Sequence, residues 1–202
     1  MNVLLWLLLG YFAGSFPSGY LAARLVRGTD IRTTGSGNVG ATNVGRLMGK
    51  KWAAAVSVAD MVKASVGLLL ARAFGVTEPW LLALIACAGV LGHVFPLWLG
   101  FKGGKGVSSI YGVLFFLFPP TSFLLAPAGG IVWFLVLKLT GYVSVASLVS
   151  LWCMPPLAAL LSFPAPYVIA LAALAALSTI LHRDNIRRLK NGTESRFGKP
   201  RP

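Results

Sequence analysis

Residues 34–51 read TGSGNVGATNVGRLMGKK and separate two long apolar segments. The glycines allow the backbone to turn tightly and to approach a ligand closely. The polar and cationic side chains of this stretch are Ser36, Asn38, Thr42, Asn43, Arg46, Lys50 and Lys51, and it contains no carboxylate. Such a stretch suits an anion, above all a phosphate, held by backbone N–H groups and basic side chains. The alternative is a solvated glycine-rich loop close to a membrane.

The composition indicates a membrane protein. Of 202 residues, 56% are hydrophobic and only 11% are charged, whereas soluble domains carry about 25% charged residues. The net charge of +13 does not indicate nucleic-acid binding, because the basic residues lie in short segments between apolar runs, where they set topology and attract anionic lipids. Cys87 and Cys153 lie inside apolar runs, so no disulfide framework is expected.

Apolar runs long enough to cross a bilayer recur along the chain. We therefore predict an all-α integral membrane protein with seven transmembrane helices. The predicted spans cover residues 3–23, 52–74 and 79–99, two short helices within 107–137, one span ending near 161 and one ending near 181. Pro17 is expected to kink the first span, and Pro119-Pro120 to separate the fourth from the fifth.

The basic residues predict the topology. The first run lacks a basic segment before it and is followed by Arg24 and Arg27, so it is interpreted as an uncleaved span with its N-terminus outside. Seven crossings then place nearly every Lys and Arg on the cytoplasmic side, with Arg72 as the clear exception, whereas six crossings would invert this asymmetry. The prediction is a single polytopic domain, 1–202, whose cytoplasmic active-site segments are 24–51, 100–109, 138–144 and 182–202.

Two ionisable residues fall inside the second predicted span. Asp60 and Lys63 are three positions apart, so both face one side of a helix. Ionisable groups at such a depth generally pair and face the protein interior. We interpret them as a structural pair that supports the neighbouring loop rather than as catalytic groups.

Three other motifs are set aside. Residues 35–40 match G-x-G-x-x-G, but they do not follow a strand. The second glycine-rich segment, FKGGKG at 101–106, resembles a P-loop but lacks the Ser or Thr directly after Lys105 that would hold magnesium. The two His and five acidic residues do not cluster at ligand spacing, so we expect no metal site.

The histidines differ in their surroundings. His93 stands alone at the end of a span, which is more typical of a structural histidine. His182 is followed by Arg183 and Asn185 on the predicted cytoplasmic face, where the other polar motifs converge. Several anion-binding segments on one face of an apolar helix bundle suggest an enzyme that joins a phosphorylated small molecule to a fatty acyl group. A phosphate or organophosphate transporter and a module that binds anionic lipid headgroups are the alternatives.

Three segments together resemble a known family. They are SGNVGATN at 36–43, the region from Gly92-His93 to FKGGKG at 101–106, and HRDNIRRL at 182–189 with Gly192 and Glu194. In order and spacing they are similar to the bacterial acyl-phosphate:glycerol-3-phosphate acyltransferases, the PlsY family. The resemblance implies transfer of an acyl group from acyl phosphate to the sn-1 hydroxyl of glycerol 3-phosphate, giving lysophosphatidic acid and phosphate. It also implies a multi-pass protein of the bacterial cytoplasmic membrane, with membrane lipid around it and no cofactor, nucleic acid or obligate protein partner.

The resemblance also implies the site residues. Glycerol 3-phosphate would be held by Ser36, Arg46, Lys105, His182 and Asn185, of which Ser36, Lys105 and His182 would take part in catalysis. The remaining substrate-binding positions are Asn38, Thr42, Asn43, His93, Gly103, Gly104, Gly106 and Ser144. Glu194 is expected to tie the C-terminal segment to a basic residue. The general base stays open between His182 and a phosphate oxygen of the substrate, and Ser36 as a covalent nucleophile is disfavoured because no partner base is evident beside it.

Overall fold

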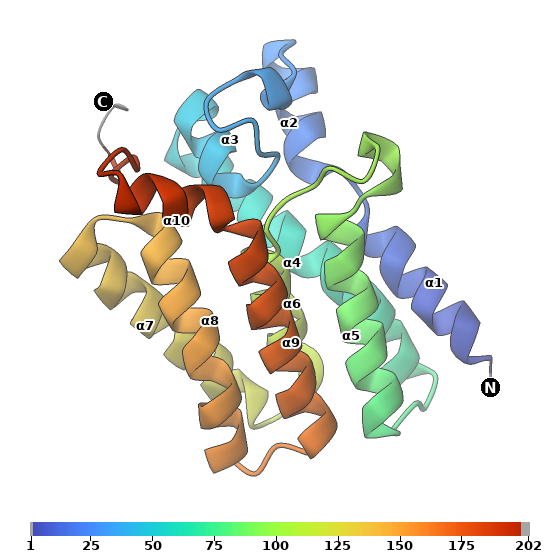
Figure 1. Ribbon diagram of the computed structural model, residues 1–202. Coiled ribbons are helices and arrows are strands. Elements are labelled where there is room, and N and C mark those ends of the chain that lie inside the picture. The colour runs from blue at the N-terminus through green and yellow to red at the C-terminus, as the bar shows by residue number, and fades with distance from the viewer. Residues whose placement is uncertain (1, 199–202) are drawn as a thin grey trace. The chain divides into compact units, whose positions relative to one another are not determined.

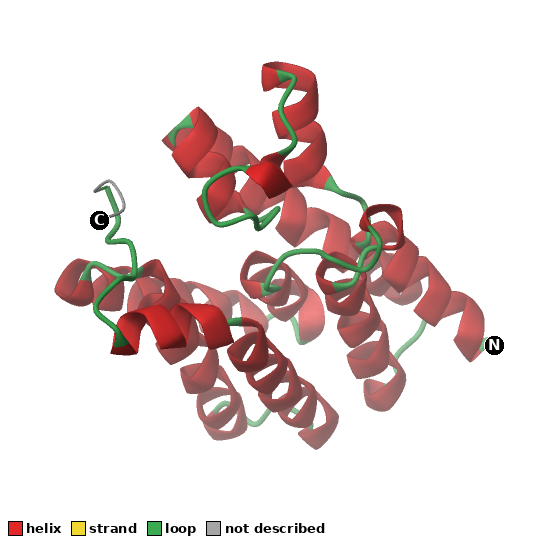
Figure 2. Cartoon of the chain, turned by 45° about the horizontal axis from the view of Figure 1, so that its top comes forward, coloured by secondary structure: helices red, strands yellow, loops and turns green. Residues whose placement is uncertain are grey.

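The computed structural model describes residues 2–198, which form helices joined by loops without any strand (Figure 2). The predicted C-terminal segment 182–202 extends to residues 199–202, which lie outside the described residues. The chain divides into two compact units, one that ends at Leu117 and one that begins at Phe118.

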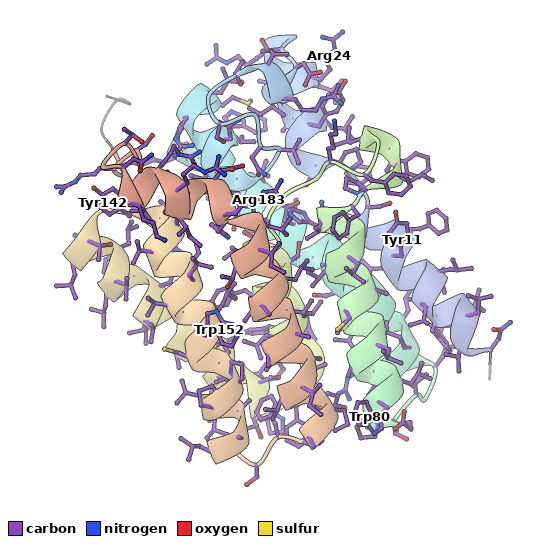
Figure 3. All side chains as sticks on the ribbon, viewed as in Figure 1. Tyr11, Arg24, Trp80, Tyr142, Trp152 and Arg183 are labelled. Atoms are coloured by element: carbon purple, nitrogen blue, oxygen red, sulfur yellow. The ribbon has the colours of Figure 1, made fainter. Side chains whose placement is uncertain are left out.

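The first unit is built on four packed apolar helices. Its elements are α1 (Val3–Gly14), α2 (Ser18–Arg27), the 3-10 turn η1 (Ile31–Thr33), α3 (Ala41–Met48), α4 (Lys50–Ala73), α5 (Pro79–Val94), the 3-10 turn η2 (Leu97–Leu99) and α6 (Val107–Leu117). Helix α1 packs against α4 and α5, and α6 packs against the same two helices, while α2 and α3 pack at one end of α4 (Figure 1). In the same unit Arg24 marks the α2 end and Trp80 the far end of α5 (Figure 3).

Glycines allow α1, α4 and α5 to approach one another closely. A Cβ at Gly14 would overlap the backbone of Gly89, and a Cβ at Gly89 would overlap the carbonyl of Ala64. Small residues at such crossings bring helix backbones into van der Waals contact, which is a main source of helix association in lipid. The polar loops at one end of this unit therefore rest on a tightly packed base.

The first predicted span is broken as expected and the segment after it contains a helix that was not predicted. Helix α1 ends at Gly14 and α2 begins at Ser18, directly after Pro17. Within the segment interpreted as a glycine-rich loop, Ala41–Met48 forms α3. It buries Val44 and exposes Arg46, so it has an apolar face to pack against α4 despite its glycine.

The second unit contains α7 (Ser122–Thr140), α8 (Val143–Leu160), α9 (Ala165–Leu181) and α10 (Arg183–Lys190). Helix α8 packs between α7 and α9. The chain bends by 56° between α9 and α10, so α10 lies across the end of α9 (Figure 1). Within this unit Tyr142 and Arg183 lie near the α10 end, whereas Trp152 lies further along α8 (Figure 3).

The apolar helices agree with the predicted spans in position, while the number of crossings stays a prediction. In the described part of the chain, five helical segments are long and apolar enough to cross a membrane: Val3–Arg27, Lys50–Ala73, Pro79–Leu99, Ser122–Thr140 and Val143–Leu160. Counting α9 with α10 as one bent span gives six. The break at Pro119-Pro120 lies where it was predicted, between an α6 of 11 residues and an α7 of 19 residues. The prediction of two short helices is therefore wrong for α7, which runs on to Thr140.

Candidate active site

A local ion pair shapes the entry to the first glycine-rich loop. The Asp30 carboxylate accepts a hydrogen bond from the backbone N–H of Arg32 at 2.9 Å and lies 2.6 Å from its guanidinium. Both contacts favour the charged carboxylate, and they lower the pKa of Asp30 to about 2. This arrangement caps η1 and directs the chain into the loop.

Asn43 holds the first glycine-rich loop together. It is buried, and its Nδ2 donates to the carbonyls of Ile31 at 3.2 Å and Thr34 at 3.0 Å. Its Oδ1 accepts from the backbone N–H of Ser36 at 3.0 Å. The amide is therefore occupied by the loop backbone, so the structure gives Asn43 a scaffolding role at a position predicted to bind substrate.

This scaffold presents Ser36 at the surface. Gly35 and Gly37 have φ of 54° and 71°, a left-handed conformation that glycine adopts without steric cost. A Cβ at Gly35 would also overlap Asn43 Oδ1. Ser36 lies between these glycines and is exposed, and Thr42 and Arg46 are exposed on α3.

The two glycine-rich loops are joined directly. Asn38 Nδ2 donates to the carbonyl of Gly103 at 3.3 Å, while its Oδ1 accepts from the N–H of Gly40 at 2.9 Å. The second glycine loop, residues 103–106, leads into the N-terminus of α6, where unpaired backbone N–H groups favour anions. Lys105 is half-buried within this loop. Segments far apart in the sequence thus form one surface of backbone, amide and cationic groups in the first unit.

A buried polar cluster lies beneath the second glycine loop. Asp60 Oδ1 accepts from Ser18 Oγ at 2.5 Å and lies 2.8 Å from Lys63 Nζ and 3.4 Å from His93 Nδ1. The predicted Asp60–Lys63 pair is confirmed. Sequence reasoning did not connect Ser18 or His93 with it, since neither residue lies at helical spacing from Asp60.

In the second unit, Glu194 organises the polar residues. Its Oε1 accepts from Ser144 Oγ at 3.0 Å and Asn185 Nδ2 at 2.6 Å, and its Oε2 accepts from Arg188 Nε at 2.7 Å. Burial opposes its ionisation, yet the hydrogen bonds that these three side chains donate outweigh that cost and lower the pKa of Glu194. The expected tie to a basic residue is confirmed with Arg188, whereas the bonds to Ser144 and Asn185 were not anticipated.

His182 occupies the bend between α9 and α10 and is buried. Its Nδ1 lies 2.7 Å from the carbonyl oxygen of Ser178. A carbonyl can only accept, so Nδ1 carries the proton in this contact. In the neutral ring Nε2 is then a hydrogen-bond acceptor, which is the state that a general base requires.

The predicted site residues therefore form two sets. The first unit contains Ser36, Asn38, Thr42, Asn43, Arg46, His93, Gly103, Gly104, Lys105 and Gly106, and the second contains Ser144, His182 and Asn185. Among residues 2–198, no three side chains of His, Cys, Asp or Glu come together as a candidate metal site. The features define a polytopic helical membrane protein whose loops combine glycine backbone, amides and cations in a manner suited to an anionic ligand.

Comparison with known proteins identifies the family. The family model described as glycerol-3-phosphate acyltransferase matches residues 4–192. A glycerol-3-phosphate acyltransferase of Desulforudis audaxviator is 45% identical, with 98% of this chain and 96% of the relative covered. One of Geobacter sulfurreducens is 39% identical, with 98% of each chain covered. The chain belongs to the glycerol-3-phosphate acyltransferase family.

The fold agrees with this membership. The crystal structure of PlsY, an integral membrane glycerol 3-phosphate acyltransferase, in its glycerol 3-phosphate form matches 97% of this chain and 96% of its own, with a TM-score of 0.89 and 37% identity. Its lysophosphatidic acid form matches with a TM-score of 0.87 and 36% identity. The comparisons support the acyltransferase interpretation and give no support to the transporter.

Proposed function

We propose that this chain transfers a fatty acyl group from an acyl phosphate to the sn-1 hydroxyl of glycerol 3-phosphate, giving lysophosphatidic acid and inorganic phosphate. The observation that carries the proposal is the hydrogen bond from Asn38 to the Gly103 carbonyl, which joins the two glycine-rich loops. Lys105 lies in the second loop, and Arg46 lies on the short helix next to the first. Two phosphate-bearing substrates require such a surface of backbone N–H groups and cations.

The reaction needs positioning and charge neutralisation more than covalent catalysis. The hydroxyl oxygen attacks the acyl carbonyl carbon, the bond between that carbon and the bridging phosphate oxygen breaks, and phosphate leaves with the electron pair. The hydroxyl proton passes to a base. Because the acyl phosphate is already an activated anhydride, holding both substrates in contact supplies much of the rate enhancement.

In this proposal some side chains bind the substrates and others hold the loops in place. Arg46 and Lys105 neutralise phosphate, and Ser36 binds glycerol 3-phosphate through its exposed hydroxyl. Asn185 takes part in binding while Glu194 fixes its amide at 2.6 Å. Asn38 and Asn43 act mainly by holding the loops, since their amides bond to loop backbone.

Two proton acceptors compete in this scheme, His182 Nε2 and a substrate phosphate oxygen, and His182→Gln separates them. Loss of a general base lowers kcat by about 10²- to 10⁴-fold, whereas loss of a binding contact raises KM and leaves kcat within a few-fold. A large fall in kcat at saturating substrates assigns the base to His182. A rise in KM alone assigns it to the phosphate.

The donor is tested with the purified protein in lipid or detergent. Palmitoyl phosphate is expected to give phosphate release that depends on glycerol 3-phosphate, together with lysophosphatidic acid, whereas palmitoyl-CoA is expected to give no product. Transfer from palmitoyl-CoA, or phosphate release without glycerol 3-phosphate, would contradict the proposal.

We further propose that the protein resides in the bacterial cytoplasmic membrane with its substrate-binding loops facing the cytoplasm. The support is the gathering of Lys and Arg in the predicted cytoplasmic segments, following the positive-inside tendency. Soluble glycerol 3-phosphate would then reach the loops from the cytoplasm, while the apolar helices accommodate the acyl chain.

A further inference from the structure

We infer that Asp60 and His93 are positioning residues that set the conformation of the second glycine loop, residues 103–106. This inference rests on the proposed phosphate-binding role of that loop. Asp60 and His93 belong to the buried polar cluster beneath the loop. In this inference they affect substrate binding through the loop and do not touch the substrate themselves.

The loop is seated on the turn that contains His93. The N–H of Gly103 donates to the carbonyl of Val94 at 3.0 Å, and the N–H of Gly104 donates to the carbonyl of His93 at 3.2 Å. A Cβ added at Gly104 would overlap the imidazole at Nε2. The ring therefore forms the floor under Gly104, and its orientation fixes how deeply the loop backbone lies.

Asp60 in turn fixes the imidazole. His93 is 5% exposed, and its buried Nδ1, which has no hydrogen-bond partner among the described residues, faces Asp60 Oδ1 at 3.4 Å, longer than a good hydrogen bond. Asp60 itself is 2% exposed. A residue that orients a neighbouring side chain in this way is a common means of keeping a binding loop rigid.

The partners in the cluster stabilise the charge of the buried Asp60 carboxylate. An isolated carboxylate within a membrane-spanning helix is unfavourable, and it is retained when partners compensate it. Lys63 supplies the compensating charge to Asp60 at 2.8 Å and also donates to the Phe16 carbonyl at 2.6 Å. Ser18 donates the remaining short hydrogen bond. The carboxylate is thus held from α2 and α4 while it faces the ring on α5.

The first glycine-rich loop depends on the same support. Asn38 donates to Gly103, whose own N–H is bonded to Val94. A change in the ring beneath Gly104 would therefore alter the junction of both loops. The phosphate of glycerol 3-phosphate does not change its charge in the reaction. Displacing a loop that holds it therefore weakens ground-state and transition-state binding alike and raises KM more than it lowers kcat.

The first experiment compares Asp60→Asn with Ser65→Ala in the full-length protein. Ser65 is similarly buried on α4, and its hydroxyl donates to the carbonyl of Met61 in its own helix. For Asp60→Asn we expect KM for at least one phosphate substrate to rise tenfold or more with kcat changed less than threefold. For Ser65→Ala we expect unchanged KM values even if Tm falls. Equal kinetic effects of both variants would overturn the inference.

A double-mutant cycle tests the contact itself. Gly104→Ala places its Cβ against the His93 ring, and His93→Ala removes the ring. We expect Gly104→Ala to lower kcat/KM at least tenfold more in the wild-type background than in the His93→Ala background. Additive effects would show that the ring does not set the loop.

The same cycle is measured on binding of glycerol 3-phosphate and of palmitoyl phosphate by calorimetry, without turnover. If the wild-type protein binds these ligands but releases no phosphate, the proposed reaction is contradicted. The positioning role is then tested by the binding cycle alone. An active wild-type protein with additive binding effects contradicts the positioning role alone. Coupled effects on the affinity for either ligand support it.

Discussion

At the scale of single residues, Arg46 combines exposure with a place on the short helix next to the first loop. Its planar guanidinium can bind phosphate through two parallel hydrogen bonds, which a Lys cannot reproduce. We predict that Arg46→Ala lowers kcat/KM by at least about 10- to 150-fold, because loss of even one charge-assisted hydrogen bond costs about 1.5–3 kcal/mol.

The matched control for Arg46 is Arg27→Ala, an exposed cation in the preceding segment. It makes the same change of net charge, and we expect it to alter kcat/KM less than threefold. Arg46→Lys should recover only part of the loss. Equal effects at both arginines would indicate a general attraction of anions instead of a specific phosphate contact.

Glu194 should make stability depend on pH in one direction. Because its pKa is lowered in the folded protein, ionised Glu194 stabilises the fold above the ordinary carboxyl pKa of about 4.3. That stabilisation is lost as pH falls through the lowered pKa. We predict that Glu194→Gln lowers Tm at pH 7, at a cost of about 1–3 kcal/mol, and that the difference from wild type shrinks below about pH 4.

The measurement for Glu194 is thermal unfolding of both proteins across this pH range. Asp184→Asn, an exposed carboxylate on α10, serves as the control and should give a small difference at every pH. A difference between wild type and Glu194→Gln that stays constant as the pH falls would argue against the ion pair.

At the scale of helices, the crossing of α1, α4 and α5 depends on glycine. A Cβ at Gly89 would overlap the Ala64 carbonyl, which belongs to backbone and cannot rotate away. We predict that Gly89→Ala destabilises the protein by about 1–3 kcal/mol through overpacking, seen as a lower Tm in detergent.

Gly130 on α7 gives the matched control for Gly89. A Cβ there would meet no atom within 4 Å, so Gly130→Ala should leave Tm unchanged or raise it, since alanine favours a helix by about 0.5–1 kcal/mol. A similar loss of Tm for both variants would show that helix crossing is not the cause.

At the scale of the whole molecule, the distribution of charge predicts seven crossings with the N-terminus outside. Single cysteines in a Cys87→Ser, Cys153→Ser background can test this. An impermeant thiol reagent added to intact cells should label Thr77→Cys and Ser162→Cys. It should not label Lys51→Cys, Lys138→Cys or Lys190→Cys. All five positions are exposed in the structure.

Lys138 is the informative position in this experiment. An unbroken segment across 107–137 would reverse the side of Lys138 and Lys190 but not of Lys51. Labelling of Lys138→Cys and Lys190→Cys, together with Thr77→Cys but without Ser162→Cys, would therefore support six crossings. Labelling of Lys51→Cys would contradict the outside N-terminus.

Features set by neighbouring residues were predictable from the sequence. The apolar runs indicated α4, α5 and α8, because burial of a helix in lipid requires a continuous apolar segment. The breaks at Pro17 and Pro119-Pro120 followed from the lost helical hydrogen bond. The Asp60–Lys63 pair followed from helical spacing. Helix α3 was missed because glycine weakens the helical signal, while its packing against α4 stabilises it.

The tertiary structure alone decided which distant groups meet. Asn38 lies 65 positions from Gly103, and Ser144 lies 50 positions from Glu194. Composition and periodicity describe neighbours along the chain, whereas these pairings depend on how the helices pack. Thus the sequence by itself determined the helical membrane class, the position of the glycine-rich segments whose composition suits an anion, and the resemblance to the family. Only packing placed His93 beneath Gly104 and Glu194 among Ser144, Asn185 and Arg188.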